Sequence, residues 1–381
     1  MVKFYLTCNW DTNENITQYW DKKLDKKNFP EIEFTNNRDE SDYFLVFNKP
    51  FIQEGDFDFM NDKTILIRME PFMEENVHLW GDWSRPDYSK FKKVIMPPNT
   101  LNFVEWHLDK TFDELMKTEI EDKTMGDTIS VIISDKYQDE GQIKRIEFIK
   151  YLQENYGDKI KLDIYGKGNL SRWGIKNHKG ELPVYKKDSG IIPYRYHFNC
   201  ENSYKLNYIT EKFYDGVFGN AFVFYSGAFN TNSIFPYGGF EFLDLDDFKT
   251  SAKQIYNCIK NNRYELDKEK IQKLKRNILE NGTISKRLYE IVTNDNEQVV
   301  FYSYKELLEN FNDICESRHA KVIEEEEEKV EEEKVEEEKE KVEKKEEEKV
   351  VDNQDIRMIL VKLITSIDNL ASAINHQNHR Q

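Results

Sequence analysis

The sequence predicts an α/β protein with two doubly wound domains that face a common cleft. Short apolar runs, rich in branched and aromatic residues, alternate along the chain with stretches of helical spacing. The alternation comes in two blocks, which meet near Met125 and Gly126. A length of 381 residues is enough for two domains that each bury a core. Strands alternating with helices favour parallel sheets.

The first predicted domain covers residues 1–125. Its expected strands are VKFYLTCNW, DYFLVFN and KTILIRMEPF, which are separated by polar residues, Gly and Pro. A stretch with helical character around FDELMK comes near its end. Apolar runs of this kind are typical of buried strands.

The second predicted domain covers residues 126–318. It opens with the strand TISVIISDK, followed by IKRIEFIKYLQENYG, in which Ile146, Ile149 and Leu152 have helical spacing, and by the strand KLDIYG. The pattern continues with YRYHFN, a helix after Thr210, the strand AFVFYSG and the helix FKTSAKQIYNCIKN. Sheets of this class bind ligands beyond the carboxyl ends of their strands, which is where we expect the functional site.

Past the second domain the chain changes character. Residues 319–352 form a predicted acidic Glu/Lys helical linker, in which Glu325 and Lys329 exemplify i, i+4 pairs. Residues 353–381 form a predicted short coiled coil, because apolar residues recur at spacings of 4, 3, 4, 3 and 4 from Ile356 to Ile374. We expect this segment to make a homo-oligomer. The alternatives are docking on the protein's own body and, third, binding to a membrane surface.

The charge and cysteine content exclude several classes of protein. Residues 324–350 hold 16 Glu and 7 Lys, which account for −9 of the formal net charge of −17. The rest of the chain is also acidic, so we expect no nucleic-acid partner. The four cysteines are scattered without a zinc-binding spacing, and reduced thiols are the simplest interpretation. No apolar run approaches the about 18–20 residues of a membrane span, which favours a soluble cytoplasmic protein.

The stretch ENSYKLNYITEK contains the clearest candidate site. Thr210 is a good helix N-cap residue, which would place Glu211 and Lys212 in the first helical turn. Free backbone N–H groups there attract anions, whereas a Lys is unfavourable for the helix itself. Lys212 makes sense as the counter-charge of a diphosphate. An incidental surface lysine is the alternative.

The run YHFNCENSYKLNYITEKFYDGVFGNAFVFYSG resembles the signature of the α1,3/α1,4-fucosyltransferases, which form glycosyltransferase family 10. The segments SDKYQDEGQIKRIEFIKYL, KLDIYGKG and GGFEFLDLDDF extend the resemblance to roughly residues 128–265, whereas residues 1–125 are similar only in outline, through SDYFLVFN, RMEPF and FKKVIMPP. The resemblance implies the GT-B fold, with residues 1–125 on the acceptor side and residues 126–318 binding GDP-fucose. It also implies transfer of fucose to a sugar hydroxyl with inversion.

Position by position, the resemblance makes Lys212 and Arg145 the two cations on the pyrophosphate of the donor. It places the remaining donor-binding positions at Glu211, Asn202, Tyr208 and Glu201. Glu70, in ILIRMEPF, matches the proposed catalytic base. The alternatives are a local turn for Glu201 and Asn202, and pairing of Glu70 with Arg68 or capping of the next helix.

No metal or other cofactor is expected. Asp244-Leu245-Asp246 has the DxD pattern that holds a metal in other glycosyltransferases, but it falls where the family has a strand-to-helix turn. The two cations already supply positive charge. The histidines form no ligand cluster and receive no role. Phe222 stands where the family often has Pro, which predicts a reshaped pocket wall and a less secure donor assignment.

The expected function is therefore α1,3-type transfer of fucose from GDP-fucose to a GlcNAc-containing glycan. One alternative is a GT-B glycosyltransferase that uses another nucleotide sugar. The other is a non-catalytic interaction protein that acts through its coiled coil. The absence of a membrane anchor in the sequence favours a bacterial or viral cytoplasmic setting over a Golgi-anchored enzyme.

Overall fold

The protein is described here by a computed structural model that covers residues 1–55, 57–70, 80–97, 100–118, 123–293, 358 and 361–362. The chain divides into two compact units, Met1–Leu307 and Leu308–Gln381. The second unit contributes only Met358, Val361 and Lys362, which are helical. The predicted acidic linker and coiled coil therefore lie almost wholly outside the described residues.

The first sheet is parallel throughout and has the strand order β2-β1-β3-β4-β5. Its strands are β1 (Val2–Cys8), β2 (Ile32–Thr35), β3 (Tyr43–Phe47), β4 (Thr64–Ile67) and β5 (Lys93–Ile95). Helix α1 (Asn13–Asp21) makes the crossover from β1 to β2. Alternate residues of β1 and β3 enter two apolar clusters, Leu6 and Phe47 on one face and Tyr5 and Val46 on the other. Both faces are buried, which explains the continuous apolar runs.

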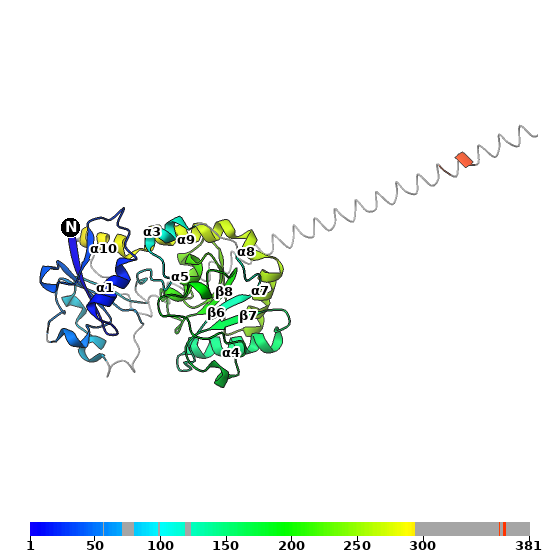
Figure 1. Cartoon of the computed structure of the whole chain (residues 1–381), viewed down its shortest axis with the longest axis horizontal. Coiled ribbons are helices and arrows are strands. Elements are labelled where there is room, and N and C mark those ends of the chain that lie inside the picture. The colour runs from blue at the N-terminus through cyan, green and yellow to red at the C-terminus, as the bar shows by residue number, and fades with distance from the viewer. Residues whose placement is uncertain are drawn as a thin grey trace, which may run out of the picture. The chain divides into compact units, whose positions relative to one another are not determined.

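The second sheet is also parallel and has the order β10-β9-β8-β6-β7. Figure 1 labels β6, β7 and β8 of this sheet. Its strands are β6 (Ile129–Ile132), β7 (Leu162–Tyr165), β8 (Tyr196–Cys200), β9 (Phe222–Ser226) and β10 (Phe240–Phe242). Its helices are α4 (Glu140–Asn155), α5 (Glu211–Phe218), α6 (Thr231–Ile234), α7 (Phe248–Lys260) and α8 (Arg263–Leu266). Short 3-10 helices occur in both halves, at Arg38–Glu40, Ile52–Glu54, Gly81–Ser84, Tyr88–Lys90, Leu170–Trp173 and Asp188–Gly190.

The two sheets share one topology. Counted from its own first strand, each has the order 2-1-3-4-5, so the chain reverses direction across the sheet between β1 and β3 and again between β6 and β8. Ligands of doubly wound sheets bind in the crevice at such switch points, beyond the carboxyl ends of the strands. Trp10 and Asn48 follow the two strands of the first switch point, and Ser134 and Glu201 follow those of the second.

Two segments cross between the predicted domains. Helix α3 (Phe112–Lys117) packs with α9 (Lys268–Gly282) in the core of the second sheet. Helix α10 (Ile284–Thr293) returns to the core of the first sheet, where the main-chain N–H of Asp25 donates to the Ser285 hydroxyl at 2.8 Å. Figure 1 shows α10 beside the N-terminal half. Packing thus crosses the expected boundary near residue 125. The expected boundaries near residues 125 and 318 stay predictions.

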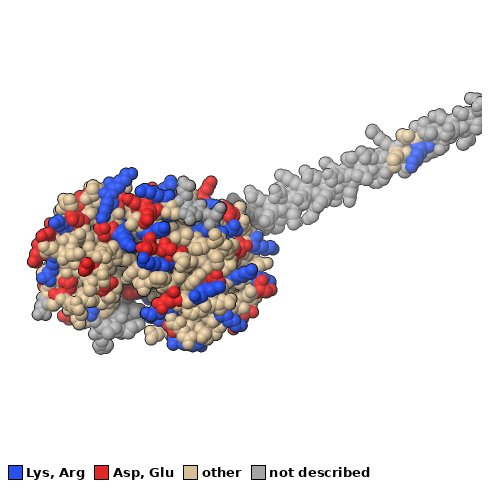
Figure 2. All heavy atoms as spheres, viewed as in Figure 1, with Lys and Arg blue, Asp and Glu red and all other residues tan. Residues whose placement is uncertain are grey.

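Surface charge and thiols agree with the sequence where the structure describes them. On the face drawn in Figure 2, the described Lys and Arg side chains are interspersed with Asp and Glu. Cys8, Cys200 and Cys258 are free thiols, whereas Cys315 lies outside the described residues. Among the helices described, none combines the length and apolar character needed to cross a membrane.

Candidate active site

A cavity of about 520 Å³ opens at the carboxyl ends of both sheets. The half of the protein that contains the first sheet contributes Trp10 and Glu70 to the cavity wall, and the half that contains the second sheet contributes Arg145 and Lys212. The cavity therefore lies at both switch points at once. Two Rossmann-like domains on a shared cleft constitute the GT-B arrangement that the sequence predicted, and this prediction is confirmed.

The start of helix α5 has the predicted cap. Thr210 is the N-cap residue, and its hydroxyl accepts a hydrogen bond from the main-chain N–H of Lys212 at 3.4 Å. Glu211 and Lys212 are the first two residues of the helix, and both line the cavity. The positive end of the α5 dipole therefore points to the same space as the Lys212 ammonium.

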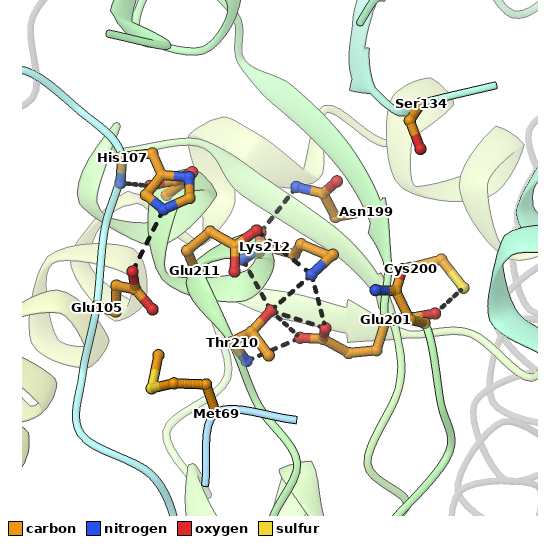
Figure 3. Close-up of polar contacts among 12 residues, drawn as sticks. Met69, Glu105, His107, Ser134, Asn199, Cys200, Glu201, Thr210, Glu211 and Lys212 are labelled. Carbon is orange, nitrogen blue, oxygen red and sulfur yellow. Dashed lines mark hydrogen bonds and ion pairs between the residues drawn. The ribbon is translucent and has the colours of Figure 1, made fainter. Parts of the chain in front are cut away.

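The Lys212 ammonium lies between two carboxylates (Figure 3). Its Nζ is 3.3 Å from Glu201 Oε2, 3.3 Å from Glu211 Oε1 and 3.0 Å from the Thr210 hydroxyl. Burial acts to lower the pKa of Lys212, but the neighbouring carboxylates, Glu201 foremost, outweigh it and raise the pKa above its ordinary value. Lys212 is thus a fixed, fully charged cation.

Glu201 lies behind Lys212 and does not line the cavity. Its side chain is fully buried, and its Oε1 accepts hydrogen bonds from the Thr210 main-chain N–H at 2.8 Å and from the Tyr225 hydroxyl at 3.0 Å. The resemblance grouped Glu201 with the donor-binding residues. In the structure its carboxylate instead holds the Lys212 ammonium and the N-cap in place.

Arg145 lies in the second turn of α4 and is 4% exposed. Its guanidinium donates to Asn202 Oδ1 at 3.1 Å, to the Ser134 hydroxyl at 3.3 Å and, at 3.4 Å, to the main-chain oxygen of Cys200. These contacts tie it to the switch point between β6 and β8. Burial lowers the pKa of Arg145, yet a guanidinium stays charged across the physiological range.

Glycine at position 141 makes this approach possible. A Cβ at Gly141 would lie 1.8 Å from the main-chain oxygen of Glu201, so any larger residue would push α4 away from the end of β8. The main-chain N–H of Gly141 also donates to the main-chain oxygen of Asn202 at 3.1 Å. The Asn202 main chain thus anchors α4 and its side chain holds Arg145, so neither contact is the local turn of the alternative interpretation.

Glu211 provides the second of the two carboxylates that contact the Lys212 ammonium. Burial alone would raise the pKa of Glu211, but Lys212, Lys187 and His107 outweigh burial and lower it below its ordinary value. The carboxylate therefore remains ionised. It lines the cavity, where it can accept hydrogen bonds from ligand hydroxyls.

Glu70 reaches the cavity from the first sheet, three residues past β4. The buried Tyr208 hydroxyl donates to Glu70 Oε2 at 2.6 Å, so Tyr208 orients Glu70 rather than lining the cavity. Burial raises the pKa of Glu70, against the opposing effects of Lys212 and the Tyr208 bond. The expected alternative partner, Arg68, instead donates to the main-chain oxygen of Asn48 at 2.8 Å.

A second polar group on the cavity wall was missed by the sequence reasoning. Glu105 and His107 line the cavity from an extended segment, with His107 Nε2 3.4 Å from Glu105 Oε1. The His107 main-chain N–H donates at 2.6 Å to Asp215, which also pairs with Lys187 at 2.9 Å. The only sequence signal was the i, i+2 spacing within FVEWH, which places both side chains on one face of an extended segment.

Two features singled out in the sequence, the DxD pattern and Phe222, lie away from the site. Asp244 Oδ1 accepts the main-chain N–H of Asp246 at 2.9 Å in the turn between β10 and α7, and Asp246 pairs with Lys144 at 2.6 Å. This is the predicted strand-to-helix turn. The expectation of a pocket wall reshaped by Phe222 is wrong, because this side chain is buried in the core at the amino end of β9, opposite the carboxyl edge where the cavity opens.

A family model provides the comparison that decides the class of protein. Residues 122–268 match the model described as glycosyltransferase family 10 (fucosyltransferase), C-terminal part. This segment is a family 10 domain. It contains Arg145, Asn202 and the start of α5, and it encloses the region that the sequence resemblance covered. The chain therefore contains a glycosyltransferase domain of the fucosyltransferase type.

Several solved glycosyltransferases are similar in structure to this chain. A crystal structure of an α1,3-fucosyltransferase has 17% identity and a TM-score of 0.44, covering 79% of this chain and 93% of its own. An α1,3-fucosyltransferase with GDP-fucose has 16% identity and a TM-score of 0.43, covering 74% and 92%. WaaG, a glycosyltransferase of lipopolysaccharide biosynthesis, has 8% identity and a TM-score of 0.44, covering 77% and 100%. No curated protein matches the chain in sequence.

Proposed function

We propose that the protein transfers fucose from GDP-fucose to a hydroxyl of a GlcNAc-containing glycan, with inversion at the anomeric carbon. The observation that carries the proposal is the arrangement of charges around one cavity. Two cations held by protein contacts, Arg145 and Lys212, lie on the wall formed by the family 10 domain, and the half-buried carboxylate of Glu70 lies on the opposite wall. An inverting transfer needs these groups on opposite sides of the reacting carbon.

The two cations would bind the pyrophosphate of the donor. When the bond between the fucose carbon and the phosphate oxygen breaks, the bonding electron pair leaves with GDP, and its oxygen gains negative charge. Arg145 offers a planar fork for phosphate oxygens, and Lys212 offers a compact charge beside the α5 dipole. Both are held by protein contacts before any ligand binds, so little reorganisation is needed when the charge develops.

Glu70 would act as the general base. The acceptor oxygen forms the new bond to the anomeric carbon on the face opposite the departing GDP, and its proton passes to the Glu70 carboxylate. The Tyr208 hydrogen bond to Oε2 fixes the carboxylate and leaves the other oxygen for the acceptor. The raised pKa of Glu70 makes it a stronger base than an exposed carboxylate.

Glu211 and Asn202 would contact the hydroxyl groups of the donor. Both line the cavity beside the cations, and Asn202 already bonds Arg145 through its amide oxygen. The α1,3 linkage and the GlcNAc acceptor are proposed from the family resemblance of residues 128–265 alone.

The proposed mechanism requires no metal ion, because the two cations neutralise the negative charge on the leaving group.

Nucleotide-induced thermal stabilisation of the full chain tests the donor assignment. We expect GDP to raise the melting temperature more than UDP or ADP does, because only the nucleotide of the true donor fits the whole site. Arg145→Lys should weaken the GDP effect, since a lysine lacks the planar fork. The matched control is Lys144→Gln on the same helix, where Lys144 pairs with Glu140 and Asp246 instead of lining the cavity.

Release of GDP from GDP-fucose, measured in parallel, tests the reaction itself. The rate of GDP release should be lower than that of the wild type in Arg145→Lys and equal to it in Lys144→Gln. Stronger stabilisation by UDP than by GDP would show that the donor is another nucleotide sugar. If GDP stabilised Arg145→Lys as much as Lys144→Gln, Arg145 would not be a GDP-binding residue.

A further inference from the structure

Asn199 is a buried amide that reaches the cavity from the carboxyl end of β8. Its side chain lines the cavity, although the residue is only 3% exposed. Its Nδ2 donates to the main-chain oxygen of Lys212 at 2.8 Å, which ties it to the first turn of α5 (Figure 3). A main-chain oxygen only accepts hydrogen bonds, so this contact identifies the nitrogen of the amide.

His197, two residues earlier on the same face of β8, contacts the same amide nitrogen. Its Nε2 lies 2.5 Å from Asn199 Nδ2, and its Nδ1 lies 3.1 Å from the Ser130 hydroxyl. That hydroxyl donates its only hydrogen to the main-chain oxygen of Gly190. Ser130 can therefore only accept from His197, so the imidazole carries its proton on Nδ1, and Nε2 accepts from Asn199.

Burial keeps the His197 imidazole neutral. The residue has no exposed surface, and burial, together with the charge of Lys187, lowers the pKa of His197 to about 3. Helix α5 passes directly over the ring, since a Cβ at Gly216 would lie 3.0 Å from His197 Cδ2. A second proton, on Nε2, would point at the N–H groups of Asn199. The neutral ring is thus the form that the surrounding contacts require.

The contacts of Asn199 determine which end of its amide faces the ligand. One N–H is used on the Lys212 main chain and the other on His197. Among the described residues none donates to the amide oxygen, Oδ1, and Figure 3 shows this oxygen directed away from Lys212. Asn199 therefore presents a hydrogen-bond acceptor, and no donor, to the cavity.

An acceptor beside Lys212 distinguishes between the parts of a nucleotide sugar. Phosphate oxygens also only accept hydrogen bonds, so Oδ1 repels them, whereas Lys212 and Arg145 attract them. The groups that flank the diphosphate are the ribose on one side and the transferred sugar on the other. Both carry hydroxyls that can donate a hydrogen bond. Oδ1 therefore suits a sugar hydroxyl next to the diphosphate.

We propose that His197 is a positioning residue, which fixes the Asn199 amide so that its Oδ1 accepts a hydrogen bond from a sugar hydroxyl of the donor. The inference rests on the proposed function and adds two residues to which the family resemblance gave no role. Only Asn199 touches the ligand, and His197 acts through it. A buried histidine that served the core alone would not affect which nucleotide is bound.

Isothermal titration calorimetry without acceptor tests the hydroxyl contact, with GDP, 2′-deoxy-GDP, 3′-deoxy-GDP and GDP-fucose as ligands. If Oδ1 contacts the ribose, the wild type binds GDP about three- to tenfold more tightly than one deoxy analogue, and Asn199→Leu loses this preference. If Oδ1 contacts the transferred sugar, Asn199→Leu binds GDP normally and GDP-fucose about three- to tenfold more weakly. Asn199→Ala serves as a second variant should the leucine variant fold poorly.

Two substitutions of His197 test its action through Asn199. Leucine removes the acceptor, whereas glutamine offers an amide oxygen in its place. His197→Leu should lose the same preference as Asn199→Leu, with no further loss in the double variant, and His197→Gln should keep most of it. The control is Ser251→Ala, which removes a buried hydrogen bond of 2.6 Å to the Asp244 main chain, away from the cavity, and should leave all affinities unchanged.

The tautomer of His197 gives a readout that does not depend on ligand binding. In ¹⁵N NMR of the histidine-labelled wild type at pH 7, the His197 signals are assigned by their absence from His197→Gln. They should be those of a neutral ring with its proton on Nδ1. A proton on Nε2 would overturn the inference, because Nε2 could then not accept from Asn199.

The binding results separate this inference from the proposed function. Unchanged affinities for all ligands in the Asn199 variants would overturn the contact with the donor. A preference that His197→Leu retains would overturn the positioning role. Absence of GDP binding to the wild type would refute the proposed function instead.

Discussion

Replacing Lys212 by methionine removes the cation that lies between the buried carboxylate of Glu201 and the partly exposed carboxylate of Glu211. Glu201 is fully buried, and Lys212 Nζ, 3.3 Å away, is the one cation paired with it among the residues described. Breaking a buried ion pair from one side leaves an uncompensated charge and costs about 3–5 kcal/mol. That is a large share of a typical unfolding free energy of about 5–15 kcal/mol. We therefore expect Lys212→Met to lower stability as well as turnover.

A double variant separates the structural loss from the catalytic one. In Lys212→Met with Glu201→Gln the buried charge is gone, and the glutamine oxygen can still accept from Thr210 and Tyr225. Most of the lost stability should return. Turnover should stay about 10²–10³-fold below the wild type, because the leaving group still lacks a stabilising donor.

The assays are urea unfolding followed by circular dichroism and release of GDP from GDP-fucose. Lys144→Gln is the control, since the carboxylates that Lys144 pairs with are 61% and 71% exposed and such pairs contribute only about 0–1 kcal/mol. Wild-type stability in the single variant would refute the buried-charge argument. Wild-type turnover in the double variant would refute a role for Lys212 on the leaving group.

Three further predictions concern the base, the metal and the C-terminal segment. Glu70→Gln should abolish turnover and keep the stabilisation by GDP. The wild-type rate should rise with pH through the pKa of Glu70, because a general base must be unprotonated, and burial raises this pKa. A rate that rises at the ordinary pKa of glutamate instead would contradict this. Turnover should survive EDTA, whereas a loss restored by Mg²⁺ or Mn²⁺ would contradict a metal-free mechanism. Deleting residues 320–381 should preserve turnover and reduce the number of chains per particle, which is the light-scattering mass divided by the mass of one chain; an unchanged number would exclude the predicted coiled coil as the oligomerisation segment.

Local patterns in the sequence were sufficient for the fold class and for part of the site. Apolar runs that alternate with helical spacing predicted two parallel sheets, because strands buried on both faces need continuous apolar residues. The Thr210 cap and the places of Glu211 and Lys212 were predictable because a cap involves residues only two or three apart. Arg145 was located through the family resemblance and through its place on a regular helix.

Tertiary structure alone decided what these side chains contact. Glu70 and Tyr208 are separated by 138 residues and meet only because the two sheets face one cavity. The burial of Glu201 behind Lys212 has no signature in the spacing of residues along the chain. The physical reason is that caps and periodic patterns depend on neighbours in sequence. The surroundings of a side chain at a sheet edge depend instead on which distant strands and loops end beside it.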